Sequence, residues 1–150
     1  MSHKELIKQF FTLQEERVKT YRTFDSGFKE YLESAPDYDF PSYRQLVHDI
    51  TQKFNKISSD VITIETNFRE AGHTSIAELI RRIQLKEKEK LELTAQFQIA
   101  QQNSASDPSN ESKADETTAV KLSLQKLVDL IVELLEELKY EAEDILLEDT

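Results

Sequence analysis

The chain contains no cysteine, only two glycines and only three prolines among its 150 residues. Without cysteine it can form neither a disulfide framework nor a thiolate nucleophile nor a cysteine-based zinc site. Because glycine and proline are so few, we expect a small number of long, uninterrupted elements. The two glycines, Gly27 and Gly72, cannot build the glycine-rich loops of P-loop or dinucleotide-binding proteins. Nucleotide binding by those routes is excluded.

Long apolar runs are also missing. The first residues, MSHKELIKQFF, are polar and lack the apolar core of a secretory signal. The longest apolar run, LVDLIVELLEEL, is interrupted by Asp129 and Glu133, so we expect no membrane span. The sequence therefore predicts a soluble intracellular protein, and its length suits one domain that buries a continuous core.

Positive charge is scarce, and the net charge is −10. Residues 1–102 carry 15 Lys and Arg against 16 Asp and Glu, whereas residues 103–150 carry 4 against 13. Tight nucleic-acid binding needs a concentrated basic face, and anionic membranes also attract basic surfaces. The acidity therefore favours a protein partner over nucleic acid or membrane.

Four long segments carry helical periodicity, and none alternates convincingly with a period of two. In the second segment, apolar residues recur at spacings of three and four, which is an a/d heptad pattern. Its members are Phe40, Tyr43, Val47, Ile50, Phe54, Ile57, Val61, Ile64 and Phe68. Asp37 or Asp39 can cap this helix, Pro41 suits its first turn, and Gly72 suits the position after its end.

The first segment, from about Ser2 to Ser34, has a similar stripe with large aromatic residues. Its apolar members are Ile7, Phe10, Phe11, Val18, Tyr21, Phe24, Phe28, Tyr31 and Leu32. Gln14 and Asp25 fall on the same stripe and need partners if they are buried.

The third segment opens with a capping-box pattern from Ser75 to Glu78. Its apolar face is strong at both ends, at Ile76, Leu79, Ile80 and Ile83 and again at Leu93, Phe97 and Ala100. Between them, the run LKEKEKLE offers few apolar residues, so this part of the helix is expected on the outside.

Residues 103–118, NSASDPSNESKADETT, are rich in Ser, Asn and Asp and predict a flexible polar linker. An acidic amphipathic helix is expected within 119–150, with heptad members Val120, Leu124, Leu127, Ile131, Leu134, Leu138 and Ile145. We therefore predict an all-α fold: an antiparallel bundle of three long helices over 1–102 and a tethered fourth. Packing of the fourth helix on this core is favoured, and docking on a partner is the alternative.

No catalytic, cofactor-binding or metal-binding residue is predicted. Arg44, His48 and Asp49 could suggest acid–base chemistry, but the heptad positions of His48 and Asp49 point away from the packing face. On that solvent side, Asp49 can pair with Lys53. A carboxylate metal site in a bundle needs inward Glu-x-x-His pairs, and the nearest match, Gln45-x-x-His48, points outward. His3 and His73 lie at the ends of segments. We expect no enzyme activity and no cofactor.

One concentration of basic residues is a candidate for partner binding, at Arg81, Arg82, Lys86, Lys88 and Lys90. It could dock an acidic partner, including the acidic fourth helix, or touch nucleic acid. The simpler interpretation is a solvated helical face, because Glu78 can pair with Arg82 and because Glu87 and Glu89 interrupt the cluster. No aromatic residues interleave to stack on bases.

A family resemblance is carried by three runs, LQEERVKTYRTFDSGFKEYL, YDFPSYRQLVHDIT and LKEKEKLELTAQFQ. Together they resemble the Required-for-excision 1-B family of eukaryotic proteins, named for a role in DNA repair. The likeness covers roughly residues 5–100. It implies an association with light-independent excision repair, and hence the nucleus, but assigns no catalytic activity, cofactor or binding residue.

Two functions follow as hypotheses. The first is a non-catalytic interaction module, an accessory factor in DNA repair, in the nucleus or the cytoplasm. The second is a coiled-coil structural or adaptor subunit of a larger assembly, with no direct role in repair. A homo-oligomer belongs to this second hypothesis and is not favoured.

Overall fold

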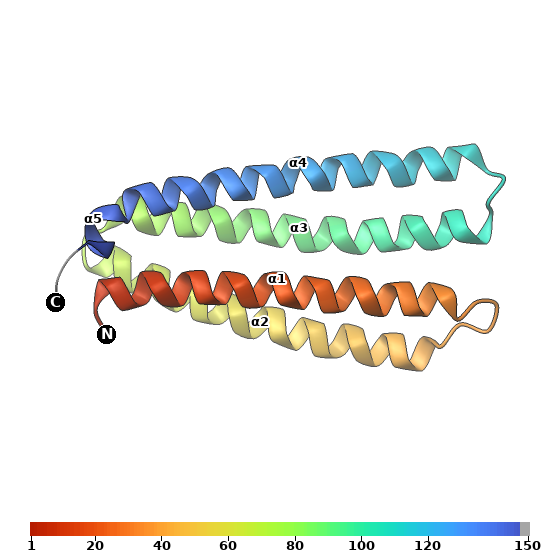
Figure 1. The fold of residues 1–150 in the computed structure, drawn as a ribbon, viewed down its shortest axis with the longest axis horizontal. Helices are drawn as coiled ribbons and strands as arrows, with labels where there is room; N and C mark the ends of the chain where they lie inside the picture. Colours follow the sequence, from red (N-terminus) through yellow and green to blue (C-terminus); the bar gives the residue numbers. More distant parts are fainter. Residues whose placement is uncertain (148–150) are drawn as a thin grey trace. The chain divides into compact units, whose positions relative to one another are not determined.

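The structure, a computed structural model, describes residues 1–147 (Figure 1). Its helices are α1 (His3–Glu33), α2 (Phe40–Glu70), α3 (Thr74–Ser106), α4 (Glu111–Glu141) and α5 (Glu143–Leu146). Among these described residues there is no strand, and none of the helices combines the length and apolar character needed to cross a membrane. The predicted all-α class is confirmed.

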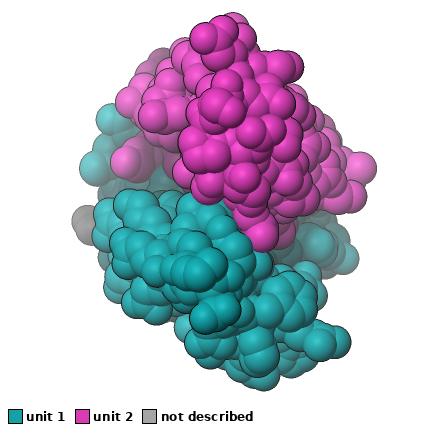
Figure 2. Space-filling view, turned by 90° about the vertical axis from the view of Figure 1, so that its right-hand side faces the viewer, with its two compact units in different colours: residues 1–77, 142–150 teal, residues 78–141 magenta. Residues whose placement is uncertain are grey.

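The described chain groups into two compact units, which Figure 2 distinguishes by colour. The first unit contains Met1–Ala77 and the segment that begins at Ala142, and the second contains Glu78–Glu141. Most of α3 is therefore grouped with α4, whereas the sequence prediction grouped the first three helices within 1–102. A four-residue connection joins α3 to α4, so these two helices form a helical hairpin.

Side chains at both ends of α1 fix its limits. The Ser2 hydroxyl accepts a hydrogen bond from the Glu5 N–H, and the Glu5 carboxylate accepts one from the Ser2 N–H, both at 3.2 Å. This is a capping box. At the other end, the Ser34 hydroxyl donates to the Tyr31 carbonyl oxygen at 2.6 Å and accepts from the Asp39 N–H at 3.0 Å. Ser34 thereby ties the end of α1 to the start of α2.

Helix α2 begins and ends as predicted. Asp39 caps its start by accepting a hydrogen bond from a backbone N–H of the first turn. Beyond its end, Gly72 has a φ of +87°, the left-handed conformation that glycine adopts readily. The Gly72 N–H donates to the Arg69 carbonyl oxygen at 3.1 Å, and the His73 N–H donates to that of Phe68 at 2.9 Å. These two bonds make a Schellman motif.

The start of α3 differs from the prediction. Helix α3 begins at Thr74, so Ser75 lies inside the first turn and not at the capping position that the Ser75–Glu78 pattern predicted. The Ala77 N–H already bonds to the His73 carbonyl oxygen at 3.1 Å, which makes His73 the residue before the helix.

The hairpin of α1 and α2 buries the predicted heptad face over most of its length. The buried members on α2 are Ile50, Phe54, Ile57, Val61, Ile64 and Phe68. Across the hairpin, the Tyr21 and Phe54 rings lie 4.6 Å apart, and the Tyr31 and Tyr43 rings stack at 4.5 Å. Phe40 is an exception, because 54% of it is exposed. It is the first residue of α2, at the open end of the hairpin, where α1 has already ended.

The buried face of α1 is rotated slightly from the predicted stripe. Val18 is exposed, and the preceding residue Arg17 is buried in its place. Gln14 is buried, as expected, and its side-chain oxygen accepts a hydrogen bond from the Arg17 guanidinium at 3.0 Å. The predicted need for a partner is met by a residue one turn away on the same helix. Asp25, in contrast, is exposed.

The flexible linker predicted over 103–118 is corrected in its extent, because only residues 107–110 connect α3 to α4. Helix α4 begins at Glu111, eight residues before the predicted range 119–150. The polar residues of this stretch find partners within helices. For example, the Thr117 hydroxyl donates to the Lys113 carbonyl oxygen at 2.9 Å and to that of Ala100 on α3 at 3.1 Å. The prediction from composition alone therefore overestimated the length of the linker.

Helix α4 carries the predicted apolar stripe, and its buried residues are Leu127, Ile131, Leu134 and Leu138. It ends at Glu141, however, so Ile145 lies in the separate short helix α5 and is buried there. The predicted packing of the fourth helix on the first three stays a prediction.

Candidate partner-binding surfaces

The five basic residues predicted to bind a partner all lie on α3, but on two sides of the helix. We call them the α3 basic surface: Arg81, Arg82, Lys86, Lys88 and Lys90. Arg82, Lys86 and Lys90 recur at every fourth position and follow one flank, whereas Arg81 and Lys88 are seven residues apart and follow another. Lys86 and Lys90 are half-buried, and the other three are exposed.

The carboxylates of this segment do not all neutralise its exposed face. The Lys86 ammonium lies 3.3 Å from the Glu89 carboxylate. Glu87 is only 5% exposed, so it does not neutralise the outer face, contrary to the expectation from the sequence. Leu85 is 53% exposed and lies between Arg81 and Lys88, four and three residues away. The outer row of α3 thus presents an apolar side chain between two positive charges.

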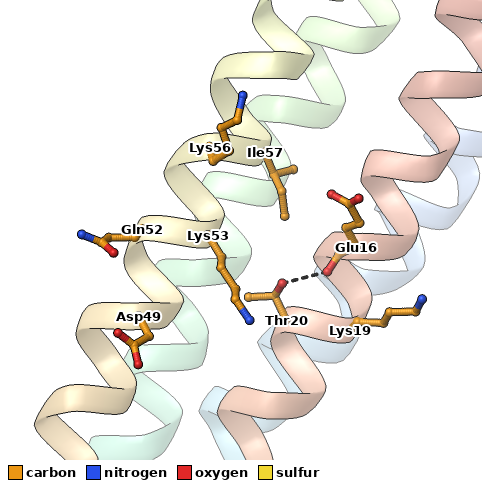
Figure 3. A pocket seen from close by; sticks show the side chains of 8 residues that line it. All are labelled: Glu16, Lys19, Thr20, Asp49, Gln52, Lys53, Lys56 and Ile57. Atoms are coloured by element: carbon orange, nitrogen blue, oxygen red, sulfur yellow. Dashed lines mark hydrogen bonds between the residues drawn. The ribbon is translucent and has the colours of Figure 1, made fainter.

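A groove of about 680 Å³ lies between α1 and α2 (Figure 3). We call it the α1–α2 groove, and its lining residues are Glu16, Lys19 and Thr20 from α1 and Asp49, Gln52, Lys53, Lys56 and Ile57 from α2. Thr20 and Ile57 are buried, and the three lysines are exposed. The Thr20 hydroxyl donates to the Glu16 carbonyl oxygen at 2.8 Å, so it is occupied within α1.

The charges along this groove are only partly paired. The predicted ion pair between Asp49 and Lys53 does not form, because the Asp49 carboxylate accepts a hydrogen bond from the Gln45 amide at 3.0 Å. The Lys53 side chain extends instead from α2 toward α1 (Figure 3). Lys56 lies 2.8 Å from the Asp60 carboxylate. Lys19 and Lys53 take part in no ion pair with any of residues 1–147.

The residues that suggested acid–base chemistry lie on the exposed face of α2, as the heptad positions of His48 and Asp49 predicted. Arg44, His48 and Asp49 are all exposed. With Phe40, Arg44 and His48 border a shallow hollow formed by one helix. This surface is open to water, whereas catalytic groups generally work in a site from which water is excluded.

Aromatic residues gather where α1 and α2 approach their connection. The Tyr43 ring lies 4.5 Å from that of Tyr31 and 5.9 Å from that of Phe28, and Tyr38 lies 5.1 Å from Tyr31. Burial raises the pKa of the Tyr43 hydroxyl above its ordinary value of 10.0, and the neighbouring Tyr31 hydroxyl adds to the rise. The Tyr43 hydroxyl of the folded protein therefore keeps its proton to a higher pH than that of an exposed tyrosine.

Two histidines meet at the opposite end of the hairpin, which sequence reasoning did not foresee. The His3 and His73 rings lie 4.7 Å apart, edge to face, and both lie near the Phe68 ring, at 5.3 and 5.9 Å. The Schellman motif after α2 turns His73 back toward this end. Within residues 1–147, no three side chains cluster in a way that could hold a metal ion.

The sequence is similar to a known family and to curated proteins of two mammals. A family model described as DNA repair REX1-B matches residues 5–101. A Required for excision 1-B domain-containing protein of Bos taurus is 30% identical over 143 residues, which cover 93% of this chain and 77% of the relative. The protein of the same name from Mus musculus is 32% identical over 141 residues, which cover 92% and 80%. No solved structure matches the chain.

Proposed function

Since the chain belongs to the DNA repair REX1-B family, we propose that it is a non-catalytic helical interaction module that serves as an accessory factor in DNA excision repair. The names of the family and of the mammalian relatives support the association with repair. The residues on its surface support binding of a protein, because they offer charged and apolar side chains on long helices.

The observation that carries this proposal is the outer row of α3. Leu85 is exposed between Arg81 and Lys88, which are exposed too. An exposed apolar side chain beside arginine and lysine can be buried on docking while the charges select the partner. The partner fitting this row is a protein that presents an apolar side chain beside carboxylates. We place this function in the nucleus, where excision repair takes place.

The test is recovery of partners from cells by immunoprecipitation and mass spectrometry. We expect repair or chromatin factors to be recovered reproducibly with the native chain and to be lost with the Arg81→Glu, Lys88→Glu variant. The matched control is Lys121→Glu with Lys126→Glu, which changes the net charge equally at two exposed positions of α4. Recovery of no repair or chromatin factor would contradict the proposal.

The alternative is a structural or adaptor subunit that self-associates or joins a larger assembly. It is favoured by large aliphatic side chains that are exposed on three different helices, at Ile62, Leu85, Ile99, Leu122 and Val132. Light scattering tests whether the chain self-associates, because a concentration-independent mass of 17.5 kDa would exclude a stable homo-oligomer. Retention on DNA that falls steeply with salt would instead favour direct nucleic-acid binding.

A further inference from the structure

We propose that the outer row of α3 binds α4 of a second copy of this chain. The proposal rests on the proposed function and deepens it, because it names an occupant for the row in which Leu85 lies between Arg81 and Lys88. The sequence alone did not favour a homo-oligomer. The argument for one comes from the structure, where two exposed rows on neighbouring helices match each other in charge, in apolar character and in level.

Helix α4 carries the complementary row, which we call the outer row of α4: Asp129, Val132 and Glu136. Val132 is 48% exposed, and both carboxylates are exposed. Their spacings of three and four residues place them on one strip of the helix. Asp129 lies two residues from each of the buried residues Leu127 and Ile131, so this strip points away from the buried side of α4. Helix α4 therefore presents an apolar side chain between two negative charges.

The two outer rows lie at the same level of the α3–α4 hairpin. Figure 1 shows the two helices side by side, and the hydrogen bond of 3.1 Å from the Thr117 hydroxyl to the Ala100 carbonyl oxygen sets their register. Leu85 lies 15 residues before Ala100, and Val132 lies 15 residues after Thr117, so equal rises bring both to one level. The same count places every member of one row level with a complementary member of the other: Arg81 with Glu136, Leu85 with Val132, and Lys88 with Asp129.

This coincidence of levels is what a symmetric dimer of hairpins requires. When the two-fold axis of a dimer runs parallel to the helices, every residue keeps its level along that axis. Helix α3 of one copy then lies antiparallel to α4 of the other copy, in the same register as within its own hairpin. At this register Leu85 meets Val132 of the second copy, and each cation of α3 meets a carboxylate of α4. Both sets of contacts occur twice in the dimer.

The charges of both rows are available for a second copy. Within residues 1–147, none of Arg81, Lys88, Asp129 and Glu136 takes part in an ion pair. Dimerisation would bury the apolar side chains at the centre and leave the charges around them, which is the usual arrangement of a protein interface. A nucleic acid bound along α3 would instead bring its phosphates toward the carboxylates of α4. The second copy is therefore the occupant that satisfies both rows together.

The experiment is a charge-reversal complementation with the full-length chain, followed by light scattering. The first variant carries Arg81→Glu with Lys88→Glu, and the second carries Asp129→Lys with Glu136→Lys. The mass of the native chain should rise from 17.5 kDa toward twice that value between about 1 and 100 µM. Each variant alone should dimerise at least about tenfold more weakly, because like charges then meet at every charged contact. An equimolar mixture should restore dimerisation, because the reversed rows complement each other.

The controls separate the two rows from net charge and from folding. Lys29→Glu with Arg44→Glu changes the net charge as much as the first reversal, at exposed positions of α1 and α2, and should leave dimerisation unchanged. Leu85→Ala should weaken dimerisation at least about tenfold, because each dimer loses two apolar contacts. Added salt should weaken the native dimer, since it screens exposed ion pairs. Thermal unfolding checks that each variant is folded.

Cross-linking tests the register directly, because a chain without cysteine allows single thiols to be introduced at chosen positions. Glu92 and Gln125 are exposed and are level with each other by the same count. A mixture of Glu92→Cys and Gln125→Cys should form a disulfide-linked dimer on mild oxidation. A mixture of Asn103→Cys and Gln125→Cys should not, because these positions differ in level by 11 residues, which is about 16 Å.

Several outcomes would overturn the proposal. A mass of 17.5 kDa at every concentration would exclude the dimer, and a mixture of the two reversed variants that stays monomeric would mean that the rows do not meet. Equal weakening by the control pair would reduce the effect to net charge, and cross-linking at Asn103 but not at Glu92 would refute the register.

Failure of this inference is distinguishable from failure of the proposed function. If the chain is monomeric but Arg81→Glu with Lys88→Glu still abolishes recovery of repair or chromatin factors, another protein occupies the outer row of α3, and only the dimer is refuted. If the chain dimerises as described but no repair or chromatin factor is recovered with it, the dimer stands and the proposed role in repair is refuted.

Discussion

Gly27 on α1 lies directly against Leu46 on α2, and a Cβ atom at Gly27 would overlap the Leu46 Cδ2 atom. The other Leu46 carbons, Cγ and Cδ1, would both lie 3.2 Å from that Cβ. A glycine in the middle of a helix ordinarily weakens it. Here it leaves room for Leu46, so the two helices can approach each other closely beside the α1–α2 groove.

A double-mutant cycle tests this relationship. In a Leu46→Ala background, we expect Gly27→Ala to raise the free energy of unfolding by up to about 1 kcal/mol, because alanine favours the helix. With Leu46 present, this gain should disappear, because the leucine side chain must rotate away from the new methyl group. Urea unfolding should give a coupling of at least about 0.5 kcal/mol between the two sites. Additive effects would mean that the packing of the Leu46 side chain does not depend on a glycine at position 27.

Gly72 differs from Gly27, because glycine is needed at position 72 for its backbone conformation and not to leave room for a neighbour. Its φ is +87°, and a Cβ atom there would meet nothing within 4 Å. Gly72→Ala should therefore lower the free energy of unfolding by about 1 kcal/mol through backbone strain alone. Gly72→Asn should cost less, because asparagine tolerates the left-handed conformation better. Chemical denaturation measures both, and equal costs for Ala and Asn would argue against this explanation.

Features that depend on short sequence spacing could be predicted. The heptad stripe from Ile50 to Phe68 is buried on α2, and Asp39 and Gly72 take the predicted positions at its two ends. Each of these signals involves residues within one or two helical turns. The all-α class followed from the same local signals, because nothing in the chain competes with the helical period.

Features that depend on exact rotation or on distant residues could not be predicted. A small shift of helical phase buries Arg17 and exposes Val18, although their neighbours fit the predicted stripe. His3 and His73 meet although 69 residues lie between them, and no local pattern signals that contact. The α1–α2 groove likewise combines Lys19 and Lys53, which only the register of the hairpin brings together.

Tyr43 should make the stability of the protein depend on alkaline pH. Its folded-state pKa is raised above the ordinary value of 10.0, chiefly by burial. The unfolded chain therefore loses this proton at a lower pH than the folded protein does, so the contribution is fully present below pH 10 and is lost as pH rises through the folded-state pKa. Urea unfolding midpoints between about pH 8 and pH 11, the pH range around the tyrosine pKa, measure this loss of stability. Tyr43→Phe should flatten it, and an unchanged slope would refute the role of Tyr43.

Leucines on opposite sides of α4 should respond very differently to truncation. Leu138 is fully buried and Leu122 is 53% exposed. Leu138→Ala should lower the free energy of unfolding by about 2–5 kcal/mol, because it leaves a cavity, whereas Leu122→Ala should change it by no more than about 0.5 kcal/mol. Thermal or urea unfolding compares the two variants directly. Deletion of residues 103–150 extends the test, because a large loss of stability is expected if α4 belongs to the folded core. Small losses at Leu138 and on deletion would favour the alternative in which this acidic helix serves as a docking arm for a partner.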